Sequence, residues 1–202
     1  VVFSTTMIPP LFAQKPDRGF NLEGTTFPGT PLAAIQGKRW ALLVGIDKYD
    51  DSNISPLRYC VADVRAFYEA LIDPSLGGCE KDKVYLMTDK DTYSNHPTHT
   101  NILFRLENLA KQMKPEDTFV FYFSGHGMTR DGKPFLLSVN SDARTLSTLE
   151  VSAVPLEKVR EILSSIKAHQ ILIILDSCRN DPASGRGDKD NPLTEDFKRG
   201  IK

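Results

Sequence analysis

Two side chains in this sequence could perform nucleophilic chemistry together, the thiol of Cys178 and the imidazole of His126. A thiol attacks a carbonyl carbon as the thiolate, so it needs a neighbouring base or cation that lowers its pKa. Histidine suits that task because it exchanges protons near neutral pH. Each residue also has a common structural role, since a lone cysteine usually packs as a small hydrophobe and a Gly-His-Gly run is often only a tight turn. Their positions along the chain decide between these interpretations.

Both residues follow short apolar runs of the kind that form buried strands. The run Thr118–Phe123 leads into Ser-Gly-His-Gly at 124–127, where the glycines free the backbone to present the imidazole. The run Gln170–Leu175 leads into Asp-Ser-Cys at 176–178. Reactive groups of an open parallel sheet gather beyond the carboxyl ends of its strands. We therefore expect the histidine and the cysteine to meet at one edge of a sheet.

Strands and helices alternate along the chain, which predicts an α/β fold. Two further apolar runs, Trp40–Ile46 and Lys83–Met87, have the length of a buried strand. Helical periodicity lies between the runs, at about residues 61–72, 100–113 and 155–167, and Pro155 stands at the favoured first position of the last helix. This order predicts a mostly parallel sheet covered by helices on both faces.

The composition divides the 202 residues into three parts. Residues 1–37 are rich in Gly, Pro and Thr and are expected to form an extended N-terminal arm, either a pro-segment or the remnant of a signal. Residues 38–182 form the expected catalytic domain. Residues 183–202 are expected to be a linker whose basic residues suit processing, namely Lys189, Lys198, Arg199 and Lys202. A sheet that ends on its reactive strand looks unfinished, and a small subunit from the same precursor would complete it.

Charge and cysteine content argue against several classes of function. The 25 Lys and Arg residues nearly balance the 26 Asp and Glu residues, so no global field attracts nucleic acid or an anionic membrane. The three cysteines, Cys60, Cys79 and Cys178, form no Cys-x-x-Cys pair, which argues against a zinc site and a disulfide framework. The location of the protein stays open. The cytoplasm is favoured, whereas export would follow if residues 1–14 are the remnant of a signal.

The two strand ends together resemble the caspase-like cysteine peptidases. In the caspase signature Gln-Ala-Cys-[Arg/Gln/Gly]-Gly the histidine lies about 50 residues before the cysteine. Here His126 precedes Cys178 by 52 residues (178 − 126). Within that family the chain is similar to the metacaspase and prokaryotic orthocaspase branch. The resemblance extends over residues 38–182 and implies a caspase-like three-layer sandwich, with a mostly parallel sheet flanked by helices.

The resemblance implies a Cys–His dyad, with Cys178 as the nucleophile and His126 as its acid and base, in a peptidase activated by autoprocessing. The oxyanion hole of the family would fall on the backbone N–H groups of Gly127 and Cys178. Glycine fits position 127, because a side chain would crowd the approach of the scissile carbonyl. The dyad needs no cofactor. Many metacaspases require calcium, but that requirement stays open because the aspartates considered match no family calcium site: Asp131, Asp142, Asp188 and Asp190.

The expected substrate specificity follows from charge. True caspases carry Gln two residues before the nucleophile, where this chain has Asp176. In metacaspases this aspartate joins one from a Cys-x-x-Asp segment, matched here by Asp63, and a serine matched by Ser124. Two carboxylates in one pocket favour a cationic guest, so the resemblance implies polypeptide substrates cleaved after Arg or Lys. Taken singly, each aspartate could instead cap or solvate its own element.

Two other classes of function stay open. A caspase-like module that binds partners without catalysis would share the fold, although the intact Ser-Gly-His-Gly and Asp-Ser-Cys segments argue against it. A thiol hydrolase of another type would carry a nucleophile elbow, Gly-x-Cys-x-Gly, and residues 176–180 lack both glycines. The fold alone would not separate these functions, because function resides in the site.

Overall fold

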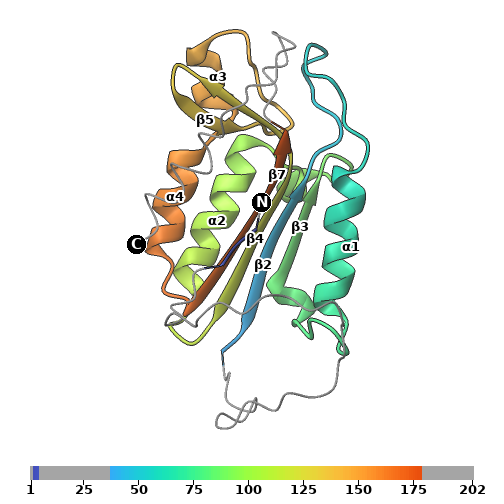
Figure 1. Ribbon diagram of the computed structural model, residues 1–202, viewed down its shortest axis with the longest axis vertical. Helices are drawn as coiled ribbons and strands as arrows, with labels where there is room; N and C mark the ends of the chain where they lie inside the picture. Colours follow the sequence, from blue (N-terminus) through green and yellow to red (C-terminus); the bar gives the residue numbers. More distant parts are fainter. Residues whose placement is uncertain (1, 5–36, 179–202) are drawn as a thin grey trace, which may run out of the picture.

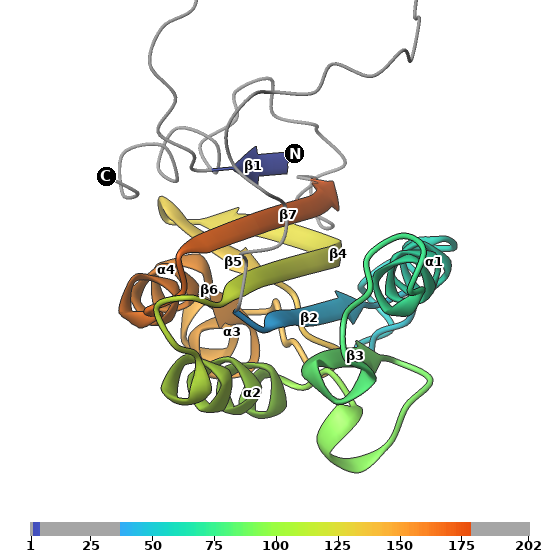
Figure 2. The same cartoon turned by 90° about the horizontal axis from the view of Figure 1, so that it is seen from below.

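The main sheet is twisted and lies between two layers of helices (Figures 1 and 2). A computed structural model describes the backbone of residues 2–4 and 37–178 and the side chains of residues 37–177. The strands of the main sheet are β1 (Val2–Ser4), β2 (Arg39–Gly45), β3 (Val84–Thr88), β4 (Thr118–Arg130) and β7 (Gln170–Cys178). They lie side by side in the order β1-β7-β4-β2-β3.

The pairing of these strands is mostly parallel. Strand β2 pairs in parallel with β3 and β4, and β4 pairs in parallel with β7. Only β1 is antiparallel within this order, at the outer edge of β7, where Phe3 lies opposite Ile173. The prediction that the sheet ends on its reactive strand was therefore wrong, because residues 2–4 of the expected N-terminal arm pair with the open edge of β7. All four apolar runs predicted as strands form strands, and the predicted mostly parallel sheet is confirmed.

Helices cover both faces of the sheet. Helix α1 (Cys60–Ile72) packs on one face, and α2 (His99–Gln112) and α4 (Leu156–Ser165) pack on the other (Figure 2). Short 3-10 helices at Lys81–Lys83 and Tyr93–Asn95 lie in the loops before and after β3. No helix in the described part of the chain combines the length and the apolar character that a membrane span requires.

Strand β4 divides its side chains between the two layers. Phe119, Phe121 and Phe123 are buried against α2 and α4, whereas Tyr122 packs with Phe67 and its neighbours on α1. Successive residues of a strand point to opposite faces. The even-numbered positions of β4, which include 124 and 126, therefore belong to the face that α1 covers.

The predicted ends of two strands were wrong. Strand β4 does not stop at Phe123 but continues to Arg130, and β7 continues past Leu175 to Cys178. The second half of β4 has a partner of its own, because β5 (Lys133–Leu136) folds back on it in a hairpin. Asp131 and Gly132, both with positive φ, form the two-residue turn of that hairpin.

A small unpredicted layer follows the hairpin. Strand β6 (Val154–Pro155) pairs with β5, and α3 (Leu146–Ser152) connects the two, with a capping box at Thr145. Pro155 belongs to this ladder, opposite Phe135. Helix α4 therefore begins at Leu156, and Pro155 is its N-cap residue rather than its first residue as predicted. These elements cover the carboxyl end of β4.

Asp117 connects the amino ends of β2 and β4 through hydrogen bonds. Its buried carboxylate accepts hydrogen bonds from the Lys38 N–H (2.7 Å), the Trp40 indole N–H (3.0 Å) and the Lys114 N–H (2.9 Å). Burial alone would raise the pKa of Asp117, but the donors at Lys114, Lys38 and Trp40 outweigh it and lower the pKa. A lowered pKa means that the ionised carboxylate stabilises the fold.

We expect Asp117→Asn to reduce the free energy of unfolding by about 1–3 kcal/mol at pH 7, because one amide oxygen cannot serve three donors. The stabilisation from Asp117 is present above the unfolded pKa of about 3.9 and is lost as pH falls through the lower folded pKa. The difference in stability between the parent and the variant should therefore shrink in urea unfolding measured from pH 7 down to pH 3. Glu116→Gln, at an exposed neighbour, is the control. Equal stability of Asp117→Asn and the parent at pH 7 would contradict this role.

Candidate active site

The two residues predicted to react occupy neighbouring positions in the sheet. The last pair in register between β4 and β7 is His126 with Cys178, and Ser124 with Asp176 is the pair two residues earlier. Both pairs belong to the face that α1 covers. The carboxyl edge of the sheet thus brings positions 126 and 178 together, although each lies within a strand rather than in a loop. The side chain of Cys178 lies outside the described residues.

The His126 imidazole is buried and oriented by a single hydrogen bond. Its exposed fraction is 7%, and Nε2 lies 2.8 Å from the carbonyl oxygen of Ser55. A carbonyl can only accept, so the neutral ring carries its proton on Nε2 and has its lone pair on Nδ1. Nδ1 is buried and has no hydrogen-bond partner among the described residues. Such a nitrogen is costly to leave unpaired, and it has the lone pair that a general base requires.

Two of the residues predicted for the substrate pocket, Ser124 and Asp176, are hydrogen-bonded, and the third, Asp63, acts through its charge on the same Cys60 thiol as Asp176. Ser124 is fully buried, and its hydroxyl donates to Asp176 Oδ2 at 3.1 Å. Asp63 lies in the first turn of α1, next to Cys60. Burial raises the pKa of the Cys60 thiol, hydrogen bonding to Ser124 lowers it, and the charges of Asp47, Asp176 and Asp63 raise it further. These carboxylates therefore share the surroundings of one thiol.

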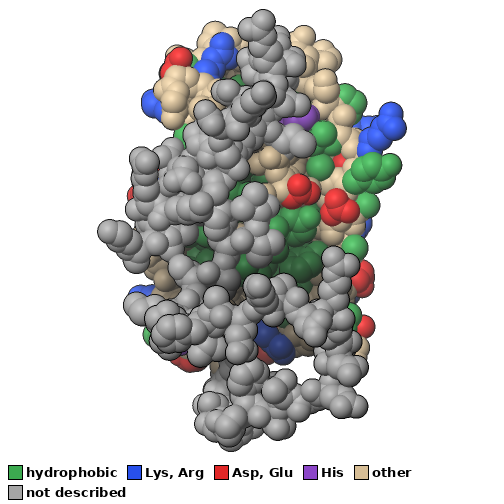
Figure 3. Space-filling view, viewed as in Figure 1, with side chains coloured by type: hydrophobic (Ala, Val, Ile, Leu, Met, Phe, Trp, Pro, Cys, Tyr) green, Lys and Arg blue, Asp and Glu red, His purple; other side chains and the backbone are tan. Residues whose placement is uncertain are grey.

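The charges of the same two carboxylates also act on the hydroxyl of Tyr122. This tyrosine precedes Ser124 by two residues on the same face of β4 and packs edge-on against Phe67. Burial raises the pKa of its hydroxyl, and the charges of Asp176 and Asp63 raise it further. Acidic side chains also lie close together on the face of the molecule that Figure 3 shows. The surroundings of positions 63 and 176 are thus negative, which disfavours a thiolate at Cys60.

The beginning of α1 is capped by a residue that lies just after β2. Tyr59, at the N-cap position, makes no side-chain capping bond. Asp47 replaces it, since its buried carboxylate accepts from the N–H groups of Cys60 (2.9 Å) and Val61 (3.4 Å). A carboxylate at a helix N-terminus satisfies free N–H groups and favours the helix dipole. Asp47 therefore positions the turn that carries Asp63.

Gly45 allows this helix to approach the sheet closely. A Cβ at position 45 would lie 2.4 Å from Val64 Cγ2 and 2.8 Å from the carbonyl oxygen of Cys60. Both distances are too short for real contacts, so any side chain here would push α1 outward. The glycine of the run Trp40–Ile46 is thus required by the packing of α1.

We expect Asp47→Ala to reduce the free energy of unfolding by about 1–2 kcal/mol, the usual effect of losing an N-cap. Because the first turn of α1 also carries Asp63, which is predicted to bind basic side chains, a higher KM for basic peptides is predicted as well. Asp47→Asn is the matched control, since its amide oxygen still accepts from Cys60. Urea unfolding and steady-state kinetics on the three proteins measure both effects. If Asp47→Ala were as stable as Asp47→Asn, the cap would not be significant.

Gly127, predicted for the oxyanion hole, lies against the neighbouring strand. A Cβ at this position would lie 3.1 Å from Ser177 Oγ and 3.3 Å from Ser177 Cβ. The close passage of β7 is therefore one reason for glycine here, in addition to the predicted approach of a substrate. The roles of the Gly127 and Cys178 N–H groups stay predictions.

Two residues of the loop after β2 were not predicted for the site. Ser55 contributes its backbone carbonyl, and Tyr49 accepts a hydrogen bond from the His126 N–H at 2.8 Å. No side-chain pattern reveals a backbone acceptor. The only signal for Tyr49 is its position just beyond the carboxyl end of a central strand, where sites of parallel sheets form.

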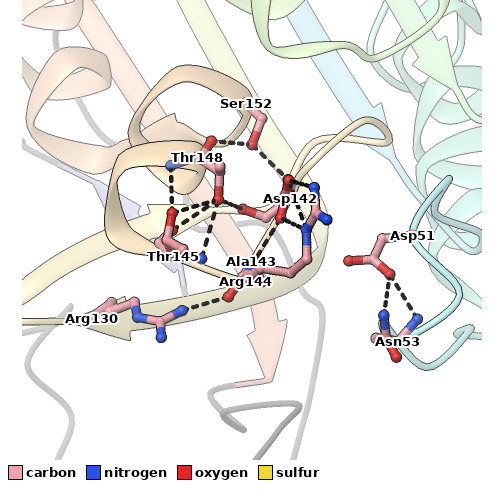
Figure 4. Close-up of polar contacts among 9 residues, drawn as sticks. All are labelled: Asp51, Asn53, Arg130, Asp142, Ala143, Arg144, Thr145, Thr148 and Ser152. Carbon is pink, nitrogen blue, oxygen red and sulfur yellow. Dashed lines mark hydrogen bonds and ion pairs between the residues drawn. The ribbon is translucent and has the colours of Figure 1, made fainter.

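The calcium question stays open. The Asp142 carboxylate accepts from the Arg144 guanidinium, with Nε 2.9 Å from Oδ1 and Nη2 2.5 Å from Oδ2 (Figure 4). These hydrogen bonds hold the pKa of Asp142 well below its usual range. Asp188 and Asp190 lie outside the described residues. Within residues 37–177, no group of three or more His, Cys, Asp or Glu side chains is arranged to hold a metal ion.

The fold and the site define an α/β protein of the caspase-like class, with a histidine and a cysteine on adjacent parallel strands. The chain matches the caspase domain over residues 38–200 and belongs to that family. The predicted relationship is thereby confirmed, and membership of a peptidase family agrees with the predicted class of enzyme, a cysteine-type peptidase.

Similar curated proteins are fungal metacaspases. Metacaspase-1A of Aspergillus niger is 31% identical over 119 residues, which are 59% of this chain and 27% of that protein. Metacaspase-1 of Meyerozyma guilliermondii is 36% identical over 109 residues, 54% of this chain and 26% of that protein. The matches thus cover only about a quarter of these relatives. The predicted closeness to the prokaryotic branch stays a prediction.

A solved structure supports the fold alone. A crystal structure of a Geobacter sulfurreducens protein superposes with a TM-score of 0.53 at 16% identity. It covers 82% of this chain and 56% of the other. At that identity the likeness concerns the path of the backbone and carries no information about substrates.

Proposed function

We propose that this chain is the catalytic part of a cysteine endopeptidase that cleaves polypeptides after Arg or Lys through a dyad of Cys178 and His126. One observation carries the proposal, the register that pairs these two positions at the carboxyl edge of the sheet. The His126 ring supports it, because Ser55 fixes Nε2 while Nδ1 has no partner among the described residues. A module without catalysis would have no use for that arrangement.

In the proposed reaction the Cys178 sulfur, as thiolate, bonds to the carbonyl carbon of the scissile peptide while His126 holds the thiol proton on Nδ1. The N–H groups of Gly127 and Cys178 stabilise the oxyanion. Collapse of the tetrahedral intermediate breaks the C–N bond, and the Nδ1 proton goes to the leaving amine. Water, deprotonated by Nδ1, then attacks the thioester carbon, the C–S bond breaks, and the acid is released while Cys178 returns as the thiolate and Nδ1 keeps the proton. The Ser55 carbonyl accepts from Nε2–H throughout, the orienting role of a third group in a triad.

The proposed preference for Arg or Lys rests on unneutralised charge. Asp63 and Asp176 influence the same Cys60 thiol and Tyr122 hydroxyl. Neither carboxylate forms an ion pair with a Lys or Arg of the described residues. A basic side chain of a substrate would neutralise both and relieve their mutual repulsion. Ser124, hydrogen-bonded to Asp176, adds a neutral polar group to the pocket.

Activation by autoprocessing, with a small subunit from the same precursor, is part of the same proposal. The basic residues that would be cut lie outside the described residues: Lys189, Lys198, Arg199 and Lys202. A preference for basic residues would let the enzyme cleave its own linker, so one specificity would serve activation and substrate cleavage.

The test is a panel of fluorogenic peptides that end in Arg, Lys or Asp. We expect cleavage of the Arg and Lys peptides, no cleavage of the Asp peptide, and no activity in Cys178→Ala. Preference for the Asp peptide would refute the assigned pocket. Activity retained by Cys178→Ala would refute the assigned nucleophile.

A further inference from the structure

The hydrogen-bond ladder between β2 and β4 ends just before the histidine. Gly45 is the last residue of β2 in register, opposite Ser124, and the Ile46 N–H donates to the Ser124 carbonyl at 3.0 Å. Alternate residues of a strand direct their backbone groups to the same side, so the His126 N–H faces the same neighbour. Because β2 has ended there, this N–H needs another partner, and a buried N–H without one is costly.

Tyr49 provides the missing partner. Three residues after Ile46, the Tyr49 hydroxyl accepts from the His126 N–H at 2.8 Å. The phenol ring lies beside the imidazole, with ring centroids 5.3 Å apart and planes inclined by 39°. Gly125 leaves the room for this contact, because a Cβ there would lie 3.1 Å from the Tyr49 hydroxyl.

The phenol is itself held in place. Tyr49 packs against two hydrophobic clusters, one beneath α2 and α4 and the other around Phe135 and Leu149. Burial raises the pKa of its hydroxyl above the usual range, the His126 N–H lowers it in part, and Cys60, Asp89 and Asp47 raise it further. The raised pKa keeps the hydroxyl protonated near neutral pH.

We infer that Tyr49 is a positioning residue for the proposed dyad, which extends the ladder of β2 to His126 and packs against its imidazole. Tyr49 holds the backbone N–H and the ring of His126, and the Ser55 carbonyl on Nε2 fixes the tautomer of that ring. Tyr49 does not contact the reacting atoms of the proposed dyad. The expected effect of Tyr49 on kcat rests on the proposed function, whereas its effect on the tautomer of His126 does not.

The test compares Tyr49→Phe with Tyr85→Phe. The first change removes the hydroxyl and keeps the ring. The second removes the hydroxyl of a half-buried tyrosine on β3 that stacks with Arg105, away from β4 and β7. We expect Tyr49→Phe to lower kcat by roughly tenfold to a hundredfold with KM little changed, the effect of a misplaced catalytic group. Tyr85→Phe should leave both constants as in the parent.

A second readout does not depend on peptidase activity. Nitrogen NMR of the His126 ring, assigned by comparison with His126→Gln, reports its tautomer. We expect an Nε2–H ring in the parent and in Tyr85→Phe, and a mixture of tautomers in Tyr49→Phe. If the parent cleaves no peptide but this change is seen, the positioning role stands and the proposed function fails. If Tyr49→Phe keeps both the ring signals and the kcat of the parent, the inference is overturned.

Discussion

Replacing His126 with alanine should lower kcat/KM for an Arg-ended peptide by about a hundredfold to ten-thousandfold, the usual contribution of a group that transfers protons in the transition state. Without the imidazole, the Cys178 thiol has no neighbouring base, and the leaving amine has no proton donor. The loss should appear mainly in kcat, because the proposed pocket of Asp63 and Asp176 still binds the basic side chain. Steady-state kinetics on the purified variants measure it.

The control for that change is His169→Ala. His169 is exposed just before β7, at the amino end of the strand, and only its backbone N–H is tied to the fold, through the Asp117 carbonyl. Activity of this variant should equal that of the parent. A His126→Ala protein that kept a tenth or more of the parent activity would show that another group transfers the protons.

Asp176→Asn is expected to lower kcat/KM for Arg peptides by about tenfold to a hundredfold, the effect of losing one charged hydrogen-bond partner of the basic side chain. The amide keeps the shape of the side chain and the acceptor for Ser124, so the change isolates charge. Asp63→Asn should act in the same direction. The rate at which iodoacetamide alkylates Cys178 should change little in both variants, because the dyad is intact.

Asp131→Asn is the matched control for the two pocket variants. Asp131 lies in the β4–β5 hairpin turn with positive φ, a conformation that asparagine tolerates. It should leave the kinetics on Arg and Lys peptides unchanged. Unaltered cleavage of Arg peptides by Asp176→Asn would remove the basis for the proposed specificity, although not for the dyad.

Four strands of the central sheet could be predicted because each is a continuous apolar run. Such runs are typical of strands that are buried on both faces of a parallel sheet. The proximity of positions 126 and 178 could be predicted because parallel strands end at the same edge, whereas the order of the strands was not predicted. The prediction therefore depended on topology rather than on any local signal near the two residues.

The remaining features depend on tertiary contacts that the local sequence does not encode. The segment 124–130 contains two glycines and was expected to leave the sheet, yet it stays extended because β7 and β5 pair with it. Strand β6 is too short to have a period. Asp47 caps α1 from thirteen residues before Cys60, and Ser55 acts through its carbonyl, so neither role could be assigned from residue type.

The most direct test of the account is to locate a covalent adduct. An Arg-ended peptide chloromethyl ketone should alkylate the parent at Cys178 alone, as seen by intact-mass analysis followed by peptide mapping. The reaction should be much slower in His126→Ala and should not occur at Cys178 with the corresponding Asp-ended reagent. Modification of Cys60 in place of Cys178, or equal reaction with both reagents, would contradict the proposed dyad and its pocket.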